Sequence, residues 1–244
     1  MTTFEVVVEV ATGWTSPTAP RALDSAAVAD VPDVAAWTES LDGPARLGLH
    51  GRTLTQLVRG EPAQLIEEAG DWVKVAAPWQ PAPEDSRGYP SWVRRAHLTP
   101  APDHQLPTLP TGSVPADPLN VMAAAGRHVG LSYLWGGTSR WGLDCSGLVH
   151  LAHREAGVVV PRDAAAQQQA ATPVALGEER PGDLYFFARD GHVYHVGFVT
   201  DPGRMLHATE DGADGAAGEG CVEDAPLTES RRATLVAAGR FVQH

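Results

Sequence analysis

Residues 143–149 read LDCSGLV, and this stretch places one of only two cysteines of the chain at the start of an apolar helical segment. The segment from residue 145 to residue 156 favours a helix, and Gly157 stands just after its last turn, where glycine commonly ends helices. A helix N-terminus carries a partial positive charge and unpaired N–H groups, which stabilise a thiolate, the nucleophilic form of cysteine. Cys145 is therefore predicted to be a nucleophile.

The residues around Cys145 support this prediction. Asp144 and Ser146 are both of types that cap helix starts. The glycines of YLWGG, residues 133–137, and of SGL allow tight backbone turns beside the thiol. The other cysteine, Cys221, lies in the Gly- and acid-rich stretch EDGADGAAGEGCVED, lacks such a setting and is predicted to be structural.

A cysteine nucleophile needs a base, usually histidine, and a group that orients the base. His192 and His195 share one predicted strand and face opposite sides of it, because their separation is odd. After the turn signal TDPG, the next predicted strand carries His207, and an odd-numbered connecting loop would place His195 and His207 on one face. The pattern predicts His195 as the base and His207 as its orienting group. His150 and His153 lie on the cysteine's own helix and are expected to point away from its start.

The first hundred residues contain short β-rich segments separated by turn signals, and a more helical stretch over residues 24–50 that Pro32 and Pro44 interrupt. Short strands at such spacing indicate a small β-barrel. The Pro-rich stretch 99–118 is typical of a linker of limited flexibility. The predicted strands are EVVVEVA (5–11), TLTQLV (53–58), AQLIEE (63–68), DWVKVAA (71–77) and SWVRRAHL (91–98).

The rest of the chain begins with helices and ends with strands, which indicates an α+β domain. PLNVMAAAGRHVG (118–130) and the segment after Cys145 are the predicted helices, and DLYFFA, HVYHVGFVT, RMLHAT and AAGRFVQ are the predicted strands. We expect a β-barrel domain over residues 1–100 with a helical insertion, a linker over 101–117 and the α+β domain over 118–244.

Composition and charge limit the kinds of partner that the protein is expected to bind and the compartment in which it is expected to work. The net charge of −12 disfavours nucleic acid, because phosphate binding needs clustered lysine and arginine. No secretory signal is recognised at the start, and no apolar stretch has the length of a membrane span. With two cysteines the chain fits a reducing compartment, so a cytoplasmic location is expected. No metal or cofactor is expected, and the oligomeric state stays open.

Four segments of the second half, in this order and context, resemble the NlpC family of papain-like bacterial cell-wall peptidases. The resemblance implies helices packed on an antiparallel sheet, with Cys145 attacking an amide carbonyl, His195 as base and His207 orienting it. It also implies that Tyr133 stabilises the oxyanion. The segments are YLWGGTSRWGLDCSGLV (133–149), VVVPRDAAAQ (158–167), ERPGDLYFF (179–187) and HVYHVGFVTDPGRMLHA (192–208).

The first half is similar to the bacterial SH3-type domain of γ-D-glutamyl-L-diamino-acid endopeptidases, which recycle muropeptides. The resemblance implies cleavage after D-Glu in L-Ala-γ-D-Glu-L-diamino-acid peptides, and a groove that the SH3-type domain closes beyond a free N-terminal L-Ala. Tyr89 and Asp144 are then expected to hold the free amine. The similar segments are VATGWTSPTAPRALD (10–24), TLTQLVRGEPAQLIEEAGDWVKV (53–75) and GYPSWVRRAHL (88–98).

One position departs from the family pattern, which has PRDS where this chain has PRDA, with Ala164. The serine of the family helps to hold the D-Glu carboxylate, and its loss removes a hydrogen bond worth about 0.5–1.5 kcal/mol. Ser146 and Arg162 are expected to do that work here. A second acidic residue is expected near the amine, and Glu61 is the hypothesis for it.

Three other functions stay open from the sequence. The same thiol and histidines could serve a transferase or deamidase, or the chain could be a secreted hydrolase of intact wall. A third possible function is that of a non-catalytic wall-binding module. The presence of all three catalytic residue types, one cysteine and two histidines, disfavours it. The identity of the diamino acid, diaminopimelate or lysine, and its amidation also stay open.

Overall fold

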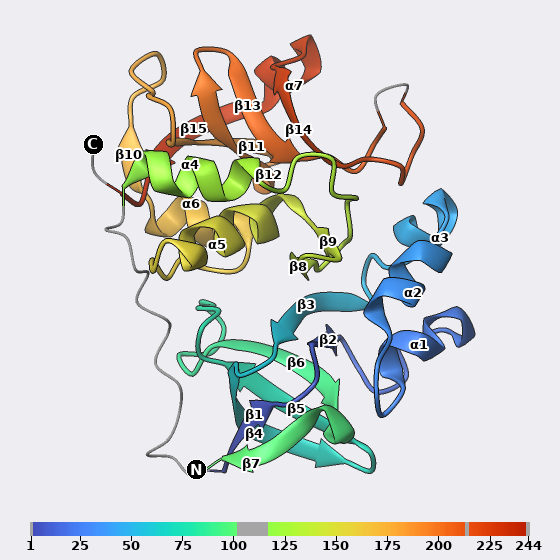
Figure 1. Ribbon diagram of the computed structural model, residues 1–244. Coiled ribbons are helices and arrows are strands. Elements are labelled where there is room, and N and C mark those ends of the chain that lie inside the picture. Colours follow the sequence, from blue (N-terminus) through green and yellow to red (C-terminus); the bar gives the residue numbers. More distant parts are fainter. Residues whose placement is uncertain (1, 102–116, 213–214, 243–244) are drawn as a thin grey trace.

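The computed structural model describes residues 2–101, 117–212 and 215–242, and it consists of a β-rich N-terminal part and an α+β C-terminal part (Figure 1). In Figure 1 the two parts are stacked, with the strands of the N-terminal part at the bottom and the helices α4, α5 and α6 above them. Most of the predicted linker, from residue 102 to residue 116, lies outside the described residues.

The N-terminal part is built on a seven-stranded antiparallel sheet in the order β3-β2-β6-β5-β4-β1-β7. This confirms the predicted all-antiparallel β domain, whereas its closure into a barrel stays a prediction. The strands are β1 (Thr3–Val6), β2 (Val10–Trp14), β3 (Thr53–Val58), β4 (Pro62–Ala69), β5 (Trp72–Ala77), β6 (Tyr89–Arg94) and β7 (Leu98–Ala101).

Two predicted strands are wrong in their extent. The run 5–11 is divided between β1 and β2, because β1 pairs with β4 and β7 whereas β2 pairs with β3 and β6. The run 91–98 is interrupted by a 3₁₀ turn over Arg95–His97 before β7 begins. Both breaks occur where the chain changes its pairing partners, and the apolar pattern does not mark such a change.

The helical stretch of the N-terminal part contains three short α-helices, which lie beside the sheet (Figure 1). Pro44 stands in the first turn of α3 and starts this helix, where the missing N–H has no cost, instead of interrupting one. Trp14 and Trp37 pack with their ring centroids 6.1 Å apart and fix these helices to β2. The helices are α1 (Ser25–Val28), α2 (Val34–Ser40) and α3 (Gly43–Leu47).

The C-terminal part packs helices on a six-stranded antiparallel sheet in the order β10-β15-β11-β12-β13-β14, which confirms the α+β prediction. Leu148 of α5, Phe186 of β11 and Phe198 of β12 are fully buried in one core between helices and sheet. The helices are α4 (Pro118–Gly126), α5 (Cys145–Glu155), α6 (Ala164–Ala170) and α7 (Glu229–Thr234). The strands of the sheet are β10 (Thr172–Val174), β11 (Leu184–Arg189), β12 (His192–Asp201), β13 (Arg204–Ala208), β14 (Val222–Pro226) and β15 (Leu235–Arg240).

Two hairpins position the groups that matter for chemistry. The turn between β11 and β12 is the pair Asp190 and Gly191, with φ angles of 50° and 78°, as two-residue hairpin turns require. β12 and β13 are antiparallel neighbours, as the turn signal TDPG predicted.

The two parts share side chains at their contact. Leu134 of the C-terminal part is buried in the same apolar cluster as Trp14 and Trp37. A small ladder of β8 (Thr138–Ser139) and β9 (Gly142–Leu143) lies beside β3, and Thr138 Oγ1 donates to the carbonyl of Gln56 at 2.8 Å. The contact places strand β3 next to the start of α5.

Candidate active site

The start of α5 is capped as the sequence predicted. Asp144 Oδ1 accepts a hydrogen bond of 2.6 Å from the backbone N–H of Gly147. A Cβ atom at position 147 would lie 2.0 Å from the carbonyl oxygen of Gly137, and Gly136 has a φ of 80°. Glycine is therefore required in both motifs, because the WGG loop passes directly against the first turn of α5.

Cys145 lies at one wall of a groove of about 680 Å³. Its sulfur accepts hydrogen bonds from the backbone of Ser146 and of Val196, the residue that follows His195. Strand β12 and the start of α5 therefore meet at the thiol. The lining includes four of the predicted site residues besides the thiol and His195, namely Tyr89, Tyr133, Asp144 and Ser146.

The histidine pair has the geometry that strand parity predicted. His195 Nε2 and His207 Nδ1 are 2.9 Å apart, and both rings are buried. Gly197 lies two residues after His195 on β12, and a Cβ atom there would be 2.9 Å from the Cβ of His207 on the neighbouring strand. One nitrogen of His195 is thus held by His207, which leaves Nδ1 for proton exchange.

The other histidines of this region do not join the pair. His150 and His153 are buried on α5, where their Nδ1 atoms contact the carbonyls of Val160 and Val149. Neither side chain lines the groove, and the exposed His192 does not line it either. The structure therefore brings His195 and His207 together, and it places the other three histidines outside the groove.

Burial controls the charges of the reacting groups. Burial, and secondly the Asp144 carboxylate, raise the pKa of the Cys145 thiol to about 12. Burial, and secondly the positive charge of Arg231, lower the pKa of His195 well below 6.5 and that of His207 to about 3. Burial therefore opposes the thiolate that the helix start favours, and it favours the neutral imidazole of both histidines.

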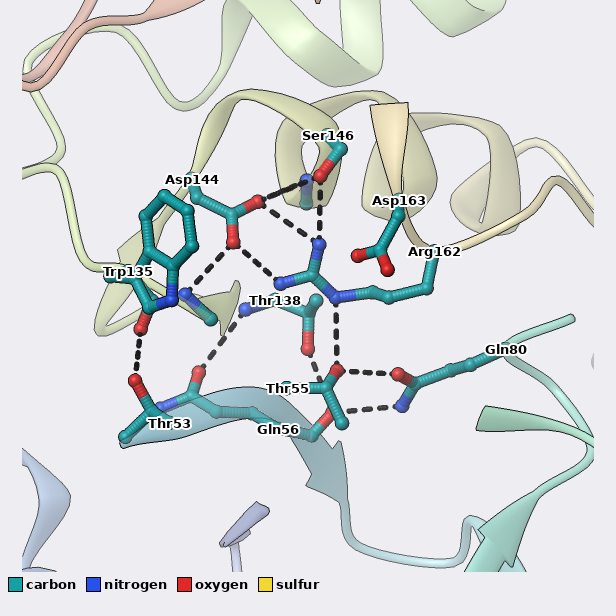
Figure 2. A network of polar contacts seen from close by, with 12 residues as sticks. Thr53, Thr55, Gln56, Gln80, Trp135, Thr138, Asp144, Ser146, Arg162 and Asp163 are labelled. Carbon is teal, nitrogen blue, oxygen red and sulfur yellow. Dashed lines mark hydrogen bonds and ion pairs between the residues drawn. The ribbon is translucent and has the colours of Figure 1, made fainter. Parts of the chain in front are cut away.

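Arg162 and Asp144 form a buried ion pair at the base of the groove (Figure 2). Nη1 of Arg162 donates to Asp144 Oδ1 at 3.0 Å, and Nη2 donates to Oδ2 at 2.7 Å. The N–H of Gly136 and the hydroxyl of Ser146 also donate to this carboxylate. With the cap of Gly147, five donors surround Asp144, so its charge is already compensated.

This network corrects part of the expected substrate contacts. Arg162 is fully buried and does not line the groove, so it is placed to position Asp144 and Ser146 instead of holding the D-Glu carboxylate. Ser146 lines the groove and remains the candidate for that contact. Glu61 is buried between Gln80 and Arg154 and does not line the groove, so the hypothesis that it meets the amine is wrong.

A different acidic residue lies beside Tyr89. The Tyr89 hydroxyl donates to Asp163 Oδ2 at 2.9 Å, and both side chains line the groove. Asp163 stands before α6 without capping it, so its second oxygen is not used by the helix. Burial raises the pKa of this carboxyl. The only sequence signal for Asp163 was its place next to Arg162 in the motif PRDA.

Further groove residues carried no sequence signal. His50, from the N-terminal part, stacks on Trp135 with ring centroids 3.8 Å apart, and its Nε2 is hydrogen-bonded to the Glu210 carboxylate. Arg189 and Arg231 line the other side of the groove. These residues come from loops and element ends whose proximity depends on the tertiary structure.

Over residues 2–101, 117–212 and 215–242, no three His, Cys, Asp or Glu side chains are grouped as a metal site would need. In the same part of the chain, every helix is too short or too polar to cross a membrane.

Residues 130–218, which contain the thiol and both histidines, match the NlpC/P60 family. These residues therefore form an NlpC/P60 domain. With a buried cysteine at the start of α5 and an adjacent histidine pair, this domain is a cysteine peptidase.

The similarity to some members extends beyond this domain. The chain is 28% identical to the gamma-D-glutamyl-L-lysine dipeptidyl-peptidase of Bacillus subtilis, over 85% of this chain and 90% of that protein. It is 27% identical to the protein of the same name from Bacillus cereus, over 82% and 81% of the two chains. The crystal structure of an NlpC/P60 family protein from Bacillus cereus superposes with a TM-score of 0.86, at 25% identity, over 99% of this chain and 100% of that one. The likeness therefore includes the N-terminal β domain.

Proposed function

We propose that this peptidase cleaves the γ-D-Glu–L-diamino acid bond of muropeptides that have a free N-terminal L-Ala, and that it serves the recycling of cell-wall peptides in the cytoplasm. The observation that carries the proposal is the pair of Tyr89 and Asp163 in the groove that also holds Cys145. Tyr89 belongs to the N-terminal domain, so this domain supplies one end of the groove.

The pair is suited to an ammonium group. The Tyr89 oxygen has lone pairs free to accept, and the Asp163 carboxylate has an oxygen beyond the one that Tyr89 occupies. Asp144, which the resemblance implied for this role, is already bound by Arg162. The Asp163 carboxylate and the Tyr89 phenol face the groove and favour the binding of an ammonium group. They leave little room for a substrate peptide that continues beyond L-Ala.

The name of the two Bacillus relatives agrees with such a site. A dipeptidyl-peptidase removes two residues from a free amino end, and L-Ala-γ-D-Glu is the dipeptide that this cleavage would release. The likeness covers the N-terminal domain as well as the NlpC/P60 domain. The N-terminal domain would therefore recognise the free amine.

The proposed reaction uses the groups already described. The Cys145 sulfur attacks the γ-carbonyl carbon of D-Glu while its proton passes to His195, and the Tyr133 hydroxyl donates to the developing oxyanion. The C–N bond then breaks as His195 returns the proton to the leaving amine. Water, deprotonated by His195, hydrolyses the thioester and regenerates the thiol. His207 holds the His195 ring in one orientation throughout.

The test compares L-Ala-γ-D-Glu-diaminopimelate with the same tripeptide acetylated on L-Ala. A hydrogen bond to a charged group is worth about 1.5–3 kcal/mol, so acetylation should lower kcat/KM about ten- to a hundred-fold. Asp163→Asn and Tyr89→Phe should narrow this difference by slowing cleavage of the free peptide. Glu84→Gln, which removes an exposed carboxylate on a nearby loop, should leave it unchanged.

Equal kcat/KM values for the free and acetylated peptides would contradict the recycling function and favour a hydrolase of intact wall. Cell fractionation tests the cytoplasmic location separately, and recovery of the protein from the culture medium or wall fraction would contradict it.

A further inference from the structure

The end of the groove away from the N-terminal domain is lined by two arginines around one tyrosine. Arg189 ends β11, Tyr194 precedes the base His195 on β12, and Arg231 lies on α7. All three line the groove together with Cys145. In Figure 1, α7 lies at the edge of the C-terminal part that is far from the strands β1–β7.

The three side chains are in mutual contact. The guanidinium carbon of Arg189 lies 4.4 Å from the Tyr194 ring centroid, and that of Arg231 lies 5.5 Å from it. Arg231 Nη1 also donates to the Tyr194 hydroxyl at 3.2 Å, and this hydroxyl contacts Thr234 Oγ1 at 3.0 Å. The arrangement holds two cations close to one aromatic ring and next to the catalytic base.

The positive charge of this pair is not neutralised. Within residues 2–101, 117–212 and 215–242, no carboxylate lies within ion-pair distance of Arg189 or Arg231. Burial raises the pKa of Tyr194, but the bond to Thr234 and the two arginines outweigh it and lower the pKa overall. Guanidinium groups without acidic partners beside a substrate groove are suited to bind carboxylates in a bidentate manner.

The acidic residues of the groove lie on other walls. Asp163 is next to Tyr89 of the N-terminal domain, and Glu210 is paired with His50 of that domain. Asp211 follows Glu210 in a loop that packs against α3, because a Cβ atom at Gly43 would be 2.6 Å from the carbonyl oxygen of Ala217. The groove is thus negative toward the N-terminal domain and positive toward α7.

Resting on the proposed function, we propose that Arg189 and Arg231 bind the carboxylates of the leaving residue and make the enzyme prefer a diamino dicarboxylic acid over lysine at that position. When the free amine of L-Ala lies at Tyr89 and Asp163, the residue beyond the scissile bond extends past Cys145 toward α7. A diamino dicarboxylic residue carries a carboxylate beside its side-chain ammonium. A lysine side chain ends in a bare ammonium, which two guanidinium groups repel.

The test measures kcat/KM for three tripeptides, L-Ala-γ-D-Glu-X, with diaminopimelate, its side-chain amide or lysine as X. The parent protein should prefer diaminopimelate over both others by about ten-fold or more, the size expected for a charge-assisted hydrogen bond. Arg189→Gln with Arg231→Gln should reduce this preference to about two-fold or less, because kcat/KM for the diaminopimelate peptide falls more than kcat/KM for the lysine peptide. Arg231→Lys keeps the charge and should retain part of the preference.

Arg232→Gln is the matched control, because Arg232 is the neighbouring exposed arginine of α7 and does not line the groove. It should keep the parent preference, and added salt should weaken the preference only where both arginines are present. Circular dichroism and thermal unfolding of each variant show that it is folded, and the single Arg189→Gln variant, at an exposed position, provides a test if the double variant does not fold.

Equal kcat/KM values for the diaminopimelate and lysine peptides in the parent, or an unchanged preference in folded variants, would overturn the subsite and leave the proposed function standing. Cleavage of none of the three peptides would overturn the proposed function and the subsite with it.

Discussion

Arg162 Nε donates a hydrogen bond of 2.9 Å to the hydroxyl of Thr55, which lies 107 positions earlier in the chain (Figure 2). Thr55 is on β3 of the N-terminal domain, and the same guanidinium holds Asp144, the cap of the catalytic helix. Thr55 in turn donates to Gln80, and Gln80 bonds with Glu61. A continuous buried network therefore connects the N-terminal domain to the residue before the nucleophile.

Thr55→Val should destabilise the protein and lower its activity, because a buried guanidinium N–H loses its acceptor. An unsatisfied buried group costs about 1–3 kcal/mol, which corresponds to a Tm lower by roughly 2–12 °C for a chain of this size. Thermal unfolding measures the change in stability, and kcat/KM measures the change in activity. Thr15→Val, at an exposed threonine of the same domain, should change Tm little. An unchanged Tm for Thr55→Val would show that the network adds nothing to stability.

Cys145→Ala should abolish peptide cleavage without unfolding the protein. Removing the nucleophile of a coupled catalytic group typically lowers the rate by ~10⁴-fold or more. Cys221→Ala should behave like the parent, since this cysteine does not line the groove. Initial rates on the free tripeptide and a circular dichroism spectrum suffice, and near-normal turnover by Cys145→Ala would refute a cysteine mechanism.

Alkylation should report the protonation of the thiol. Because burial and the Asp144 carboxylate raise the pKa of Cys145 to about 12, we expect the free enzyme to hold a thiol at neutral pH. In the Cys221→Ala background, the rate with iodoacetamide should rise about ten-fold per pH unit from pH 7 to pH 9. A plateau already reached near pH 6 would reveal a stable thiolate–imidazolium pair instead.

The histidine variants should differ in activity in a defined order. His195→Ala should be nearly inactive, His207→Ala strongly impaired and His192→Ala only mildly affected, because only the first two rings are paired at the groove. His207→Gln, which keeps a hydrogen-bonding side chain, should recover part of kcat with little change in KM. The assignment fails if His192→Ala is inactive while His195→Ala retains turnover.

Stability should fall as the pH decreases below about 6.5. Burial lowers the pKa of His153 to about 4 and that of His207 to about 3, and it lowers those of His150 and His195 well below 6.5. In the unfolded chain these groups titrate near 6.5, so between the two pKa values the unfolded state binds more protons and acid favours it. Each histidine contributes a slope of up to about 1.4 kcal/mol per pH unit.

Urea unfolding at pH 7.5, 6.5, 5.5 and 4.5 measures this slope. His153→Phe, at the ring that stacks on Phe198, should reduce the slope by one titrating group. Replacing the exposed His192 by alanine should leave it unchanged. A free energy of unfolding that is constant from pH 7.5 to pH 4.5 would contradict the buried neutral state of these histidines.

Much of the catalytic centre follows from the sequence because its causes are local. A capped helix start places Cys145, the period of two along a strand separates His195 from His192, and a four-residue turn signal pairs β12 with β13. These features depend on residues within a few positions of each other, so spacing alone predicts them. The α+β class and the antiparallel β domain follow from the same local patterns.

The substrate-facing surroundings were decided only by the tertiary structure. Asp163 meets Tyr89 across 74 positions, Arg162 meets Thr55 across 107, and Arg231 reaches Tyr194 from another element across 37. Whether a carboxylate binds a substrate or an internal arginine depends on which groups folding brings within hydrogen-bond distance. For this reason the sequence predicts substrate contacts for Arg162 and Glu61, whereas folding buries both and leaves Asp163, Arg189 and Arg231 facing the groove.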